Sequence, residues 1–218
     1  MNDIIIGNIR GLDSQANLTK PSILLDLAEH KEAFLIALTE THLSDNISSS
    51  ELVREGWDIF RADRHSRYGG GVAIYVKQSF TATDNFTIST DMCEAIGLYF
   101  PLSNTVIVTI YRPPNCELDD FAKVINKSSE WISSIECKYK KTPTVIINGD
   151  FNFPKMKSWS STEILSFLDN INDRETKDLH IGTVTKQTKI LCDLIQDLYL
   201  HQVIEGSTRK NNLLDLFF

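Results

Sequence analysis

Polar side chains that can bind a metal ion or a phosphate follow several predicted strands of this chain. Each comes just after a run of apolar residues: Asn8, Glu40, Tyr111 with Arg112, and Asp150 with Asn152. Carboxylate and amide oxygens at neighbouring strand ends are hard ligands, and Mg²⁺ prefers one or two carboxylates with open positions for water. Glu40 and Asp150 are therefore the first candidates. Each also fits an ordinary loop, capping or turn carboxylate when taken alone.

The elements that must position these side chains can be read from the hydrophobic pattern. Residues 4–6 are a β-branched run typical of a buried strand, 21–32 show helical spacing after Pro21, and 34–38 are a second apolar run. A strand, helix, strand order indicates a parallel pair with a right-handed crossover. We therefore expect Asn8 and the segment 39–42 at the same edge of a sheet, where ligands usually bind.

The rest of the chain predicts more strands and more helices. Short β runs at 57–61, 71–77, 80–88, 95–100 and 104–111 suggest an antiparallel meander. Helices are expected over 117–138, near 162–171 and over about 189–199, with strands at 144–147, 203–204 and 213–218. This mixture predicts an α/β fold of two packed sheets flanked by helices, in a single domain that spans residues 1–218.

Composition excludes several classes of protein. With 218 residues, 42% hydrophobic and 23% charged, the chain can bury a core, and it is neither disordered, collagen-like nor a coiled coil. No apolar run approaches 18 residues, and the amino terminus lacks the features of a signal peptide. We expect a nuclear or cytoplasmic protein that is neither secreted nor membrane-bound. The widely spaced cysteines are expected to be reduced core thiols: Cys93, Cys116, Cys137 and Cys192.

The net charge of −7 does not suit a protein that grips nucleic acid by bulk electrostatics. Any phosphate-bearing partner must be met by a local patch. One candidate patch lies beside the glycines 69–71, with further basic residues later in the chain: Arg61, Arg64, Arg67, Tyr68, Arg112, Arg209 and Lys210. Such residues fit a solvated face equally well. The glycines themselves are expected to bend the backbone before a strand.

The order of several sequence segments resembles the endonuclease/exonuclease/phosphatase superfamily, and within it the endonuclease domain of non-LTR (LINE-type) retrotransposons. The matching segments are Asn-Ile-Arg-Gly-Leu (8–12), Thr-Glu-Thr-His-Leu (39–43), the glycine-rich 69–75, Tyr-Arg-Pro-Pro-Asn (111–115), Asn-Gly-Asp-Phe-Asn (148–152) and 208–217, which includes Leu-Asp-Leu-Phe. The resemblance implies a four-layer α/β/β/α sandwich of the DNase I type, lacking its last strand region.

The resemblance also implies roles for individual residues. Glu40 looks like the ligand of a divalent metal, Mg²⁺ or alternatively Mn²⁺, with Asn8 beside the metal and the scissile phosphate. Asp150 looks like the residue that deprotonates the attacking water, Asn152 like a donor to phosphate oxygen, and Tyr111 like a phenol near the phosphate. Asp215 resembles the carboxylate that holds a catalytic histidine. Residues expected to contact substrate are Arg112, Asn115, Thr208 and Arg209.

After the Leu-Asp-Leu-Phe-Phe strand, family members continue into a Ser-Asp-His segment, which the 218 residues do not contain. The histidines present are not in that context: His30, His42, His65, His180 and His201. Because loss of one preorganised transition-state donor costs about 10²–10³ in rate, we expect an impaired nuclease. We also expect the strand at 213–218 to be left as an exposed apolar edge, with marginal solubility.

The function that this resemblance implies is Mg²⁺-dependent nicking of duplex DNA by a monomer, with a reverse transcriptase domain in the parent protein as partner. A phosphatase of the same superfamily is one alternative, although the Thr-Glu-Thr-His-Leu and Tyr-Arg-Pro-Pro forms favour the retrotransposon branch. A catalytically inactive, domesticated or fragmentary interaction module is another, because the histidine segment is missing.

Overall fold

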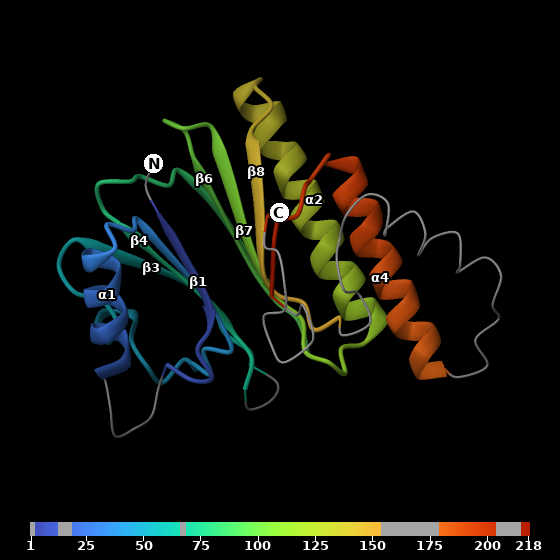
Figure 1. Cartoon of the computed structure of the whole chain (residues 1–218), viewed down its shortest axis with the longest axis horizontal. Coiled ribbons are helices and arrows are strands. Elements are labelled where there is room, and N and C mark those ends of the chain that lie inside the picture. The colour runs from blue at the N-terminus through green and yellow to red at the C-terminus, as the bar shows by residue number, and fades with distance from the viewer. Residues whose placement is uncertain (1–2, 13–18, 66–68, 154–178, 204–214) are drawn as a thin grey trace.

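Two β-sheets packed face to face form the centre of the molecule, as a computed structural model of the chain shows (Figure 1). The structure describes residues 3–12, 19–65, 69–153, 179–203 and 215–218. The first sheet has the order β1-β2-β4-β3 and the second the order β5-β6-β7-β8-β9. Helices cover the outer faces, so the described part of the chain is the expected α/β/β/α sandwich.

The first sheet contains β1 (Ile4–Asn8), β2 (Leu35–Thr39), β3 (Trp57–Ala62) and β4 (Val72–Lys77). Helix α1 (Thr19–His30) connects β1 to β2, which run parallel with Asn8 opposite Thr39. This confirms the predicted strand, helix, strand unit and the shared edge. A short 3-10 helix, η1 (Ser49–Glu51), lies in the following loop and is closed by a capping box at Ser48.

The second sheet contains β5 (Asp84–Ser89), β6 (Glu94–Phe100), β7 (Thr105–Tyr111), β8 (Thr144–Asp150) and β9 (Asp215–Phe217). Helix α2 (Leu118–Tyr139) links β7 to the parallel strand β8, and α4 (Leu179–Asp197) packs beside α2. The predicted strand at 80–88 begins four residues late, and the predicted helix at 189–199 begins ten residues early. The predicted helix near 162–171 lies outside the described residues.

The meander predicted from 57 to 111 is wrong as one continuous sheet. Strands β3 and β4 belong to the first sheet, whereas β5, β6 and β7 belong to the second, and the chain crosses between the sheets after β4. The physical reason is that both faces of each sheet must be covered: α1 covers one sheet, and α2 with α4 covers the other (Figure 1). An alternation of apolar and polar residues predicts a strand, but it does not predict which sheet that strand joins.

Each layer boundary has its own cluster of buried apolar side chains. Leu25 and Ala28 of α1 pack with Trp57 and Tyr75 on the outside of the first sheet. The helical spacing of the apolar residues in α2 places them on the outside of the second sheet: Phe121, Val124, Ile125, Ile132 and Ile135. The third cluster fills the space between the sheets, with members from β2, β4, β6 and β7.

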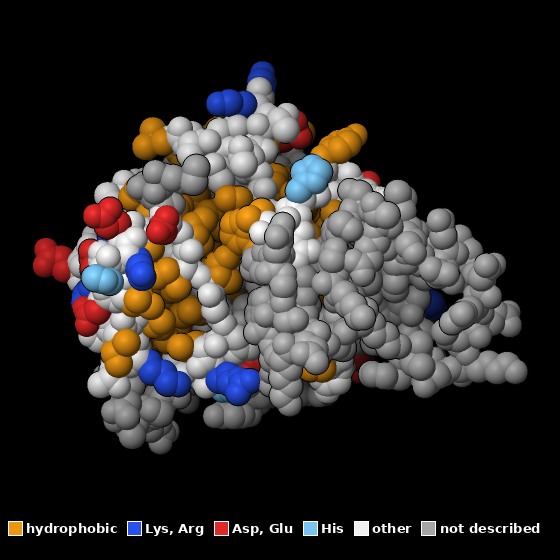
Figure 2. Space-filling view, in the orientation of Figure 1, with side chains coloured by type: hydrophobic (Ala, Val, Ile, Leu, Met, Phe, Trp, Pro, Cys, Tyr) orange, Lys and Arg blue, Asp and Glu red, His pale blue; other side chains and the backbone are white. Residues whose placement is uncertain are grey.

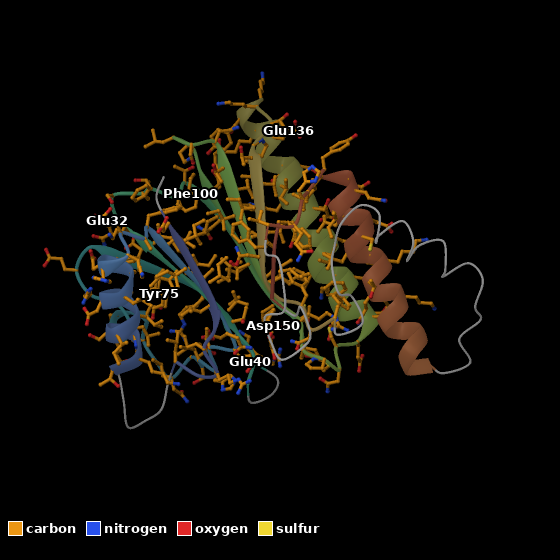
Figure 3. The ribbon with its side chains drawn as sticks, viewed as in Figure 1. Glu32, Glu40, Tyr75, Phe100, Glu136 and Asp150 are labelled. Carbon is orange, nitrogen blue, oxygen red and sulfur yellow. The ribbon has the colours of Figure 1, made fainter. Side chains whose placement is uncertain are left out.

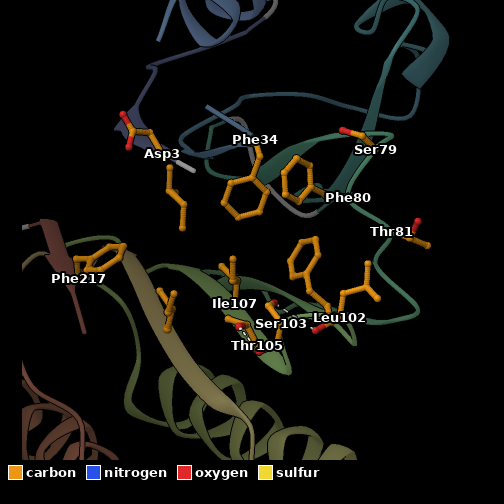
Figure 4. Close-up of a pocket in the computed structure, with 13 residues that line it drawn as sticks. Asp3, Phe34, Ser79, Phe80, Thr81, Leu102, Ser103, Thr105, Ile107 and Phe217 are labelled. Atoms are coloured by element: carbon orange, nitrogen blue, oxygen red, sulfur yellow. Dashed lines mark hydrogen bonds between the residues drawn. The ribbon is translucent and has the colours of Figure 1, made fainter. Parts of the chain in front are cut away.

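The space between the sheets ends in a cavity of about 730 Å³ (Figure 4). Its lining is mainly apolar and includes Ile4, Phe34, Phe80, Phe100, Ile107 and Phe217. On the face seen in Figure 2, hydrophobic side chains gather between the two sheets. Within the described residues, no helix is both long and apolar enough to span a membrane.

Strand β9 is an edge strand of the second sheet, as predicted for the carboxyl-terminal segment. The expected exposure of its apolar side chains is wrong, because Leu216 and Phe218 are buried, at 1% and 4% exposure. Strand β9 pairs with β8, and Val203 donates its backbone N–H to the carbonyl of Phe217. Three of the cysteines are buried free thiols as expected, whereas Cys137 is exposed because it lies on the outer face of α2.

Candidate functional site

The carboxylate of Asp150 lies at the carboxyl end of β8, and each of its oxygens accepts a hydrogen bond. Asn8, at the end of β1 in the other sheet, donates its side-chain Nδ2 to Asp150 Oδ2 at 2.9 Å. The backbone N–H of Asn152 donates to Asp150 Oδ1 at 3.2 Å. Asp150 is 3% exposed. Its orientation is therefore fixed by groups from both sheets.

Glu40 follows β2 and forms the second carboxylate of the site. Tyr111, the last residue of β7, donates its phenol to Glu40 Oε1 at 3.2 Å. Tyr111 is also the register partner of Asp150 in the parallel pair β7 and β8. Figure 3 shows Glu40 and Asp150 at the same end of the sandwich, away from Glu136 and Phe100. The structure thus brings Asn8, Glu40, Tyr111 and Asp150 together at one edge of the sandwich.

The phenol of Tyr111 sits in an unusual electrostatic environment. Burial raises the pKa of Tyr111, and the nearby carboxylates of Glu40 and Asp150 raise it further because they oppose a second negative charge. The side chain is 6% exposed. Tyr111 is therefore a neutral hydrogen-bond donor throughout the neutral pH range.

Unusual backbone conformations cluster around these residues. Glu40, His42 and Asn152 all have positive φ, at 54°, 54° and 51°. Non-glycine residues adopt this region rarely, and it is concentrated at functional sites. At Gly149 the reason for glycine is direct, because an added Cβ would lie 1.9 Å from the carbonyl oxygen of Ile110. The close approach of β7 and β8 at this point sets the spacing of Tyr111 and Asp150.

Gly71 closes the same edge from the side of β4. An added Cβ there would lie 2.5 Å from Thr41 Oγ1, and its φ is 85°. Its backbone N–H donates to the buried carboxylate of Glu94 at 3.1 Å. The glycine run therefore bends the chain before a strand, as predicted, and lets the start of β4 pack close to Thr41, the residue after Glu40.

Arg112 is not a surface residue, and the prediction that it contacts DNA is wrong for this structure. It is 1% exposed, and its guanidinium donates to the carbonyls of Phe151 and Asn152 at 3.0 and 3.1 Å and to Gln187 of α4. Its own carbonyl accepts from Asn152 Nδ2 at 2.9 Å. Arg112 therefore holds the turn that carries Asp150 and Asn152.

Two other arginines of the predicted basic patch are also engaged inside the fold. Arg64 pairs with Glu94 at 2.5 Å and lies over the Tyr111 ring, 5.6 Å from its centroid. Arg61 pairs with Asp63 and donates to the carbonyl of Ile47. The side chains of Arg64 and Arg61 are 7% and 11% exposed, which leaves little surface for phosphate contact. The rim predicted from these two residues is not formed.

The remaining predicted residues are one exposed, one buried and several whose side chains lie outside the described residues. Asn115 lies on an exposed turn after β7. The backbone of Asp215 pairs with that of Asp150, but its side chain lies outside the described residues. So do Arg67, Tyr68, Thr208, Arg209 and Lys210. The side-chain amide of Asn152 donates to the carbonyl of Arg112. Its role as a hydrogen-bond donor to phosphate therefore stays a prediction.

His42 is a site residue that sequence reasoning missed. Its Nε2 lies 3.9 Å from Glu40 Oε2, and a Cβ added at Gly69 would lie 3.7 Å from the same nitrogen. Partial burial lowers the pKa of His42, against the opposing effect of Glu40. The signal in the sequence was its position two residues after Glu40, which put it at the same strand end.

Comparison with known proteins now decides the family. Residues 7–167 match the model of the Endonuclease/Exonuclease/phosphatase family, which is more than half of the chain. The chain belongs to the endonuclease/exonuclease/phosphatase family. No curated protein sequence matches it closely enough to count as a relative.

Solved structures share the fold of this family member at low sequence identity. The endonuclease domain of TRAS1, a telomere-specific non-LTR retrotransposon, has a TM-score of 0.56 and 16% identity over 99% of this chain and 82% of that one. The AP endonuclease LMAP from Leishmania major gives 0.56 and 15%, over 98% and 77%. A variant of the 3' phosphatase NExo from Neisseria, bound to product DNA hairpin, gives 0.55 and 12%, over 98% and 84%.

Proposed function

We propose that this member of the endonuclease/exonuclease/phosphatase family hydrolyses phosphodiester bonds in duplex DNA and leaves a nick. The observation that carries the proposal is the Asp150 carboxylate, held by Asn8 from the opposite sheet and by the backbone of Asn152, beside the Tyr111–Glu40 pair. In-line attack on a phosphodiester requires an activated water and donors that do not repel an anion. A carboxylate, an amide and a neutral phenol at one edge meet these requirements.

Asp150 is the group that takes the proton from the attacking water. Its oxygens accept hydrogen bonds from Asn8 and from Asn152, and a carboxylate has about four acceptor positions in all. The bonds orient the carboxylate before substrate arrives, which lowers the reorganisation cost of the reaction. Tyr111 supplies a phenolic hydrogen that can turn from Glu40 to a phosphate oxygen.

The donor set fits Mg²⁺ as the cofactor, with Mn²⁺ as the alternative ion. Within the described residues, no group of three or more His, Cys, Asp or Glu side chains forms a ready-made metal cage. Mg²⁺ is commonly bound by one or two carboxylates together with water and substrate phosphate, and Glu40 with Asp150 provides this set. Glu40 would hold the ion, with Asn8 beside it. The ion would supply charge neutralisation at the phosphate.

The proposed substrate is duplex DNA, and the proposed setting is a retrotransposon endonuclease that acts as a monomer. The support is the Thr-Glu-Thr-His-Leu, Tyr-Arg-Pro-Pro and Leu-Asp-Leu-Phe-Phe forms, together with two solved structures of similar fold, a retrotransposon endonuclease domain and a 3' phosphatase bound to product DNA hairpin. In that setting the nick exposes a primer for a reverse transcriptase domain of the parent protein.

The test is nicking of supercoiled plasmid with Mg²⁺ by the wild-type chain, Glu40→Gln and Asp150→Asn. Both variants keep the size of the side chain and remove its charge. We expect each variant to lose activity by a factor of about 10² or more. The proposed metal ligand and the proposed proton acceptor work as one unit, so loss of either one disables the other. Removal of Mg²⁺ with a chelator should abolish nicking by the wild-type chain.

Glu55→Gln is the matched control, since Glu55 is an exposed carboxylate outside the site. It should nick like the wild-type chain. Equal activity in Asp150→Asn and Glu55→Gln would reject the proposal. If neither the wild-type chain nor any variant nicks DNA, and Asp150→Asn leaves cellular function unchanged, the result would favour the interaction module instead.

A further inference from the structure

Three polar side chains behind the site are buried without a hydrogen-bond partner. Thr39, Thr109 and Asn148 are 2%, 0% and 0% exposed. The hydroxyls of the two threonines, and both Oδ1 and Nδ2 of Asn148, make no hydrogen bond in the structure. A buried polar group without a partner is costly, and nearly all such groups in folded proteins are paired with protein or with ordered water.

The sheet register places two of these side chains together, directly behind the site. Thr109 of β7 and Asn148 of β8 are register partners. They precede Tyr111 and Asp150 by two residues, and residues two apart on a strand face the same side of the sheet. Thr109 and Asn148 therefore face the layer between the sheets.

Thr39 reaches the same layer from the first sheet. It follows Leu35 and Ala37 along β2 at intervals of two, and both of these residues belong to the cluster between the sheets. Strand β2 contacts β7 and β8. The unpaired groups thus come from both sheets and lie in one layer, immediately inside the catalytic edge.

The chemistry of these groups selects the ligand. Asn148 lacks both an acceptor for its Nδ2 hydrogens and a donor for its Oδ1, and the hydroxyls can act in either way. A cation would satisfy the oxygens but would face the Nδ2 hydrogens. An anion would lie next to the carboxylates of the site. Water donates and accepts, and buried water typically makes about three such bonds.

We propose that Asn148, Thr109 and Thr39 bind buried water between the sheets, and that Asn148 is thereby a positioning residue for the end of β8. The second half rests on the proposed function, because it concerns the placement of Asp150. The first half concerns only the fold. Water bonded to Asn148 would join β8 to β7 and β2 behind Asp150 and limit the movement of β8 against the other two strands.

The experiment compares Thr109→Val, Asn148→Leu and the double variant with the wild-type chain. Each change keeps the approximate volume and removes hydrogen-bonding groups. Thermal denaturation should show a lower Tm for each single variant. The decrease in Tm of the double variant should be smaller than the sum of the two single decreases, because both substitutions remove the same water. Oxygen-17 magnetic relaxation dispersion should show fewer long-lived waters in both. Thr87→Val, at an exposed position on β5, is the control and should change neither measurement.

An increase in Tm on Thr109→Val or Asn148→Leu would overturn the water site, since it would mean that an unpaired group had simply been removed. Strict additivity in the double variant would overturn it too. Positioning is read from the Asn8 side-chain amide resonances, which report the bond to Asp150 and do not depend on nicking. These should shift in Asn148→Leu, and unchanged resonances would overturn the positioning role.

Plasmid nicking then separates the two proposals. If the wild-type chain nicks DNA, Asn148→Leu should lower kcat by about 10- to 100-fold with little change in KM, because binding contacts remain while the geometry is loosened. An unchanged kcat would reject the positioning role. If the wild-type chain does not nick, the proposed function fails, while the Tm, relaxation and resonance measurements still decide the water site and the positioning of Asp150.

Discussion

At the scale of single residues, the site depends on hydrogen bonds between groups that are far apart in the sequence. Asn8 and Asp150 are separated by 142 positions, and Glu40 and Tyr111 by 71. The type of each residue and its place at a strand end could be predicted from the sequence. The burial of Arg112 could not, because an arginine is usually exposed and its partner Gln187 lies 75 positions away.

The raised pKa of Tyr111 predicts a specific dependence of stability on alkaline pH. The unfolded phenol ionises near its ordinary pKa of 10.0, whereas the folded phenol resists ionisation because of burial and the two carboxylates. The stability from this group is therefore complete below pH 10 and is lost as the pH rises above 10. Urea denaturation between pH 9 and 11 should show that the free energy of unfolding falls less steeply with pH in Tyr111→Phe than in the wild-type chain.

Tyr75 provides the comparison for this measurement, because burial also raises its pKa. It lies in the cluster under α1, away from both carboxylates. Tyr75→Phe should remove only the part of the alkaline loss of stability that comes from Tyr75. The part that comes from Tyr111 should remain. If Tyr111→Phe shows the same alkaline slope as the wild-type chain, the environment assigned to the phenol is wrong.

At the scale of elements, most helices and strands follow from the spacing of apolar residues, as α2 shows with its buried stripe. Their assignment to sheets does not follow. The chain leaves the first sheet after β4 and enters the second at β5, which depends on which faces the helices cover. The early start of α4 escaped prediction because 179–188 contains few large apolar residues.

Helix α4 is tied to the turn that carries Asp150 and Asn152 through the side chain of Gln187, and replacing that side chain tests the role of the helix. Gln187 Oε1 accepts from Arg112 Nε at 3.0 Å, and Gln187 Nε2 donates to the carbonyl of Cys116 at 2.8 Å. Gln187→Leu leaves part of a buried guanidinium unpaired. We expect the free energy of unfolding to fall by about 2–3 kcal/mol, which urea denaturation would measure.

The neighbouring Lys189 is exposed, so Lys189→Ala is the matched change on the same helix. It should alter the free energy of unfolding by less than about 0.5 kcal/mol. A cost for Gln187→Leu as small as that for Lys189→Ala would mean that α4 does not anchor the turn.

At the scale of the whole molecule, the space between the sheets changes character along the strands. Ile107 of β7 and Ile146 of β8 line the cavity, Thr109 and Asn148 follow, and Tyr111 and Asp150 complete the series at the site. Two sheets flanked by helices could be predicted from the sequence. This gradient could not, because it arises only when strands from both sheets are placed face to face.

The site and the cavity therefore lie at opposite ends of the same strands, and Ile107→Ala tests whether they are energetically separate. Ile107 is 1% exposed, so its truncation should lower the free energy of unfolding by about 2–5 kcal/mol. Catalysis should be preserved at temperatures well below the lowered Tm, because the bonds of Tyr111 to Glu40 and of Asn8 to Asp150 hold the far end. Urea denaturation and plasmid nicking on one preparation would measure both. A kcat that falls in step with stability would show instead that packing around the cavity sets the geometry at the edge that carries Glu40 and Asp150.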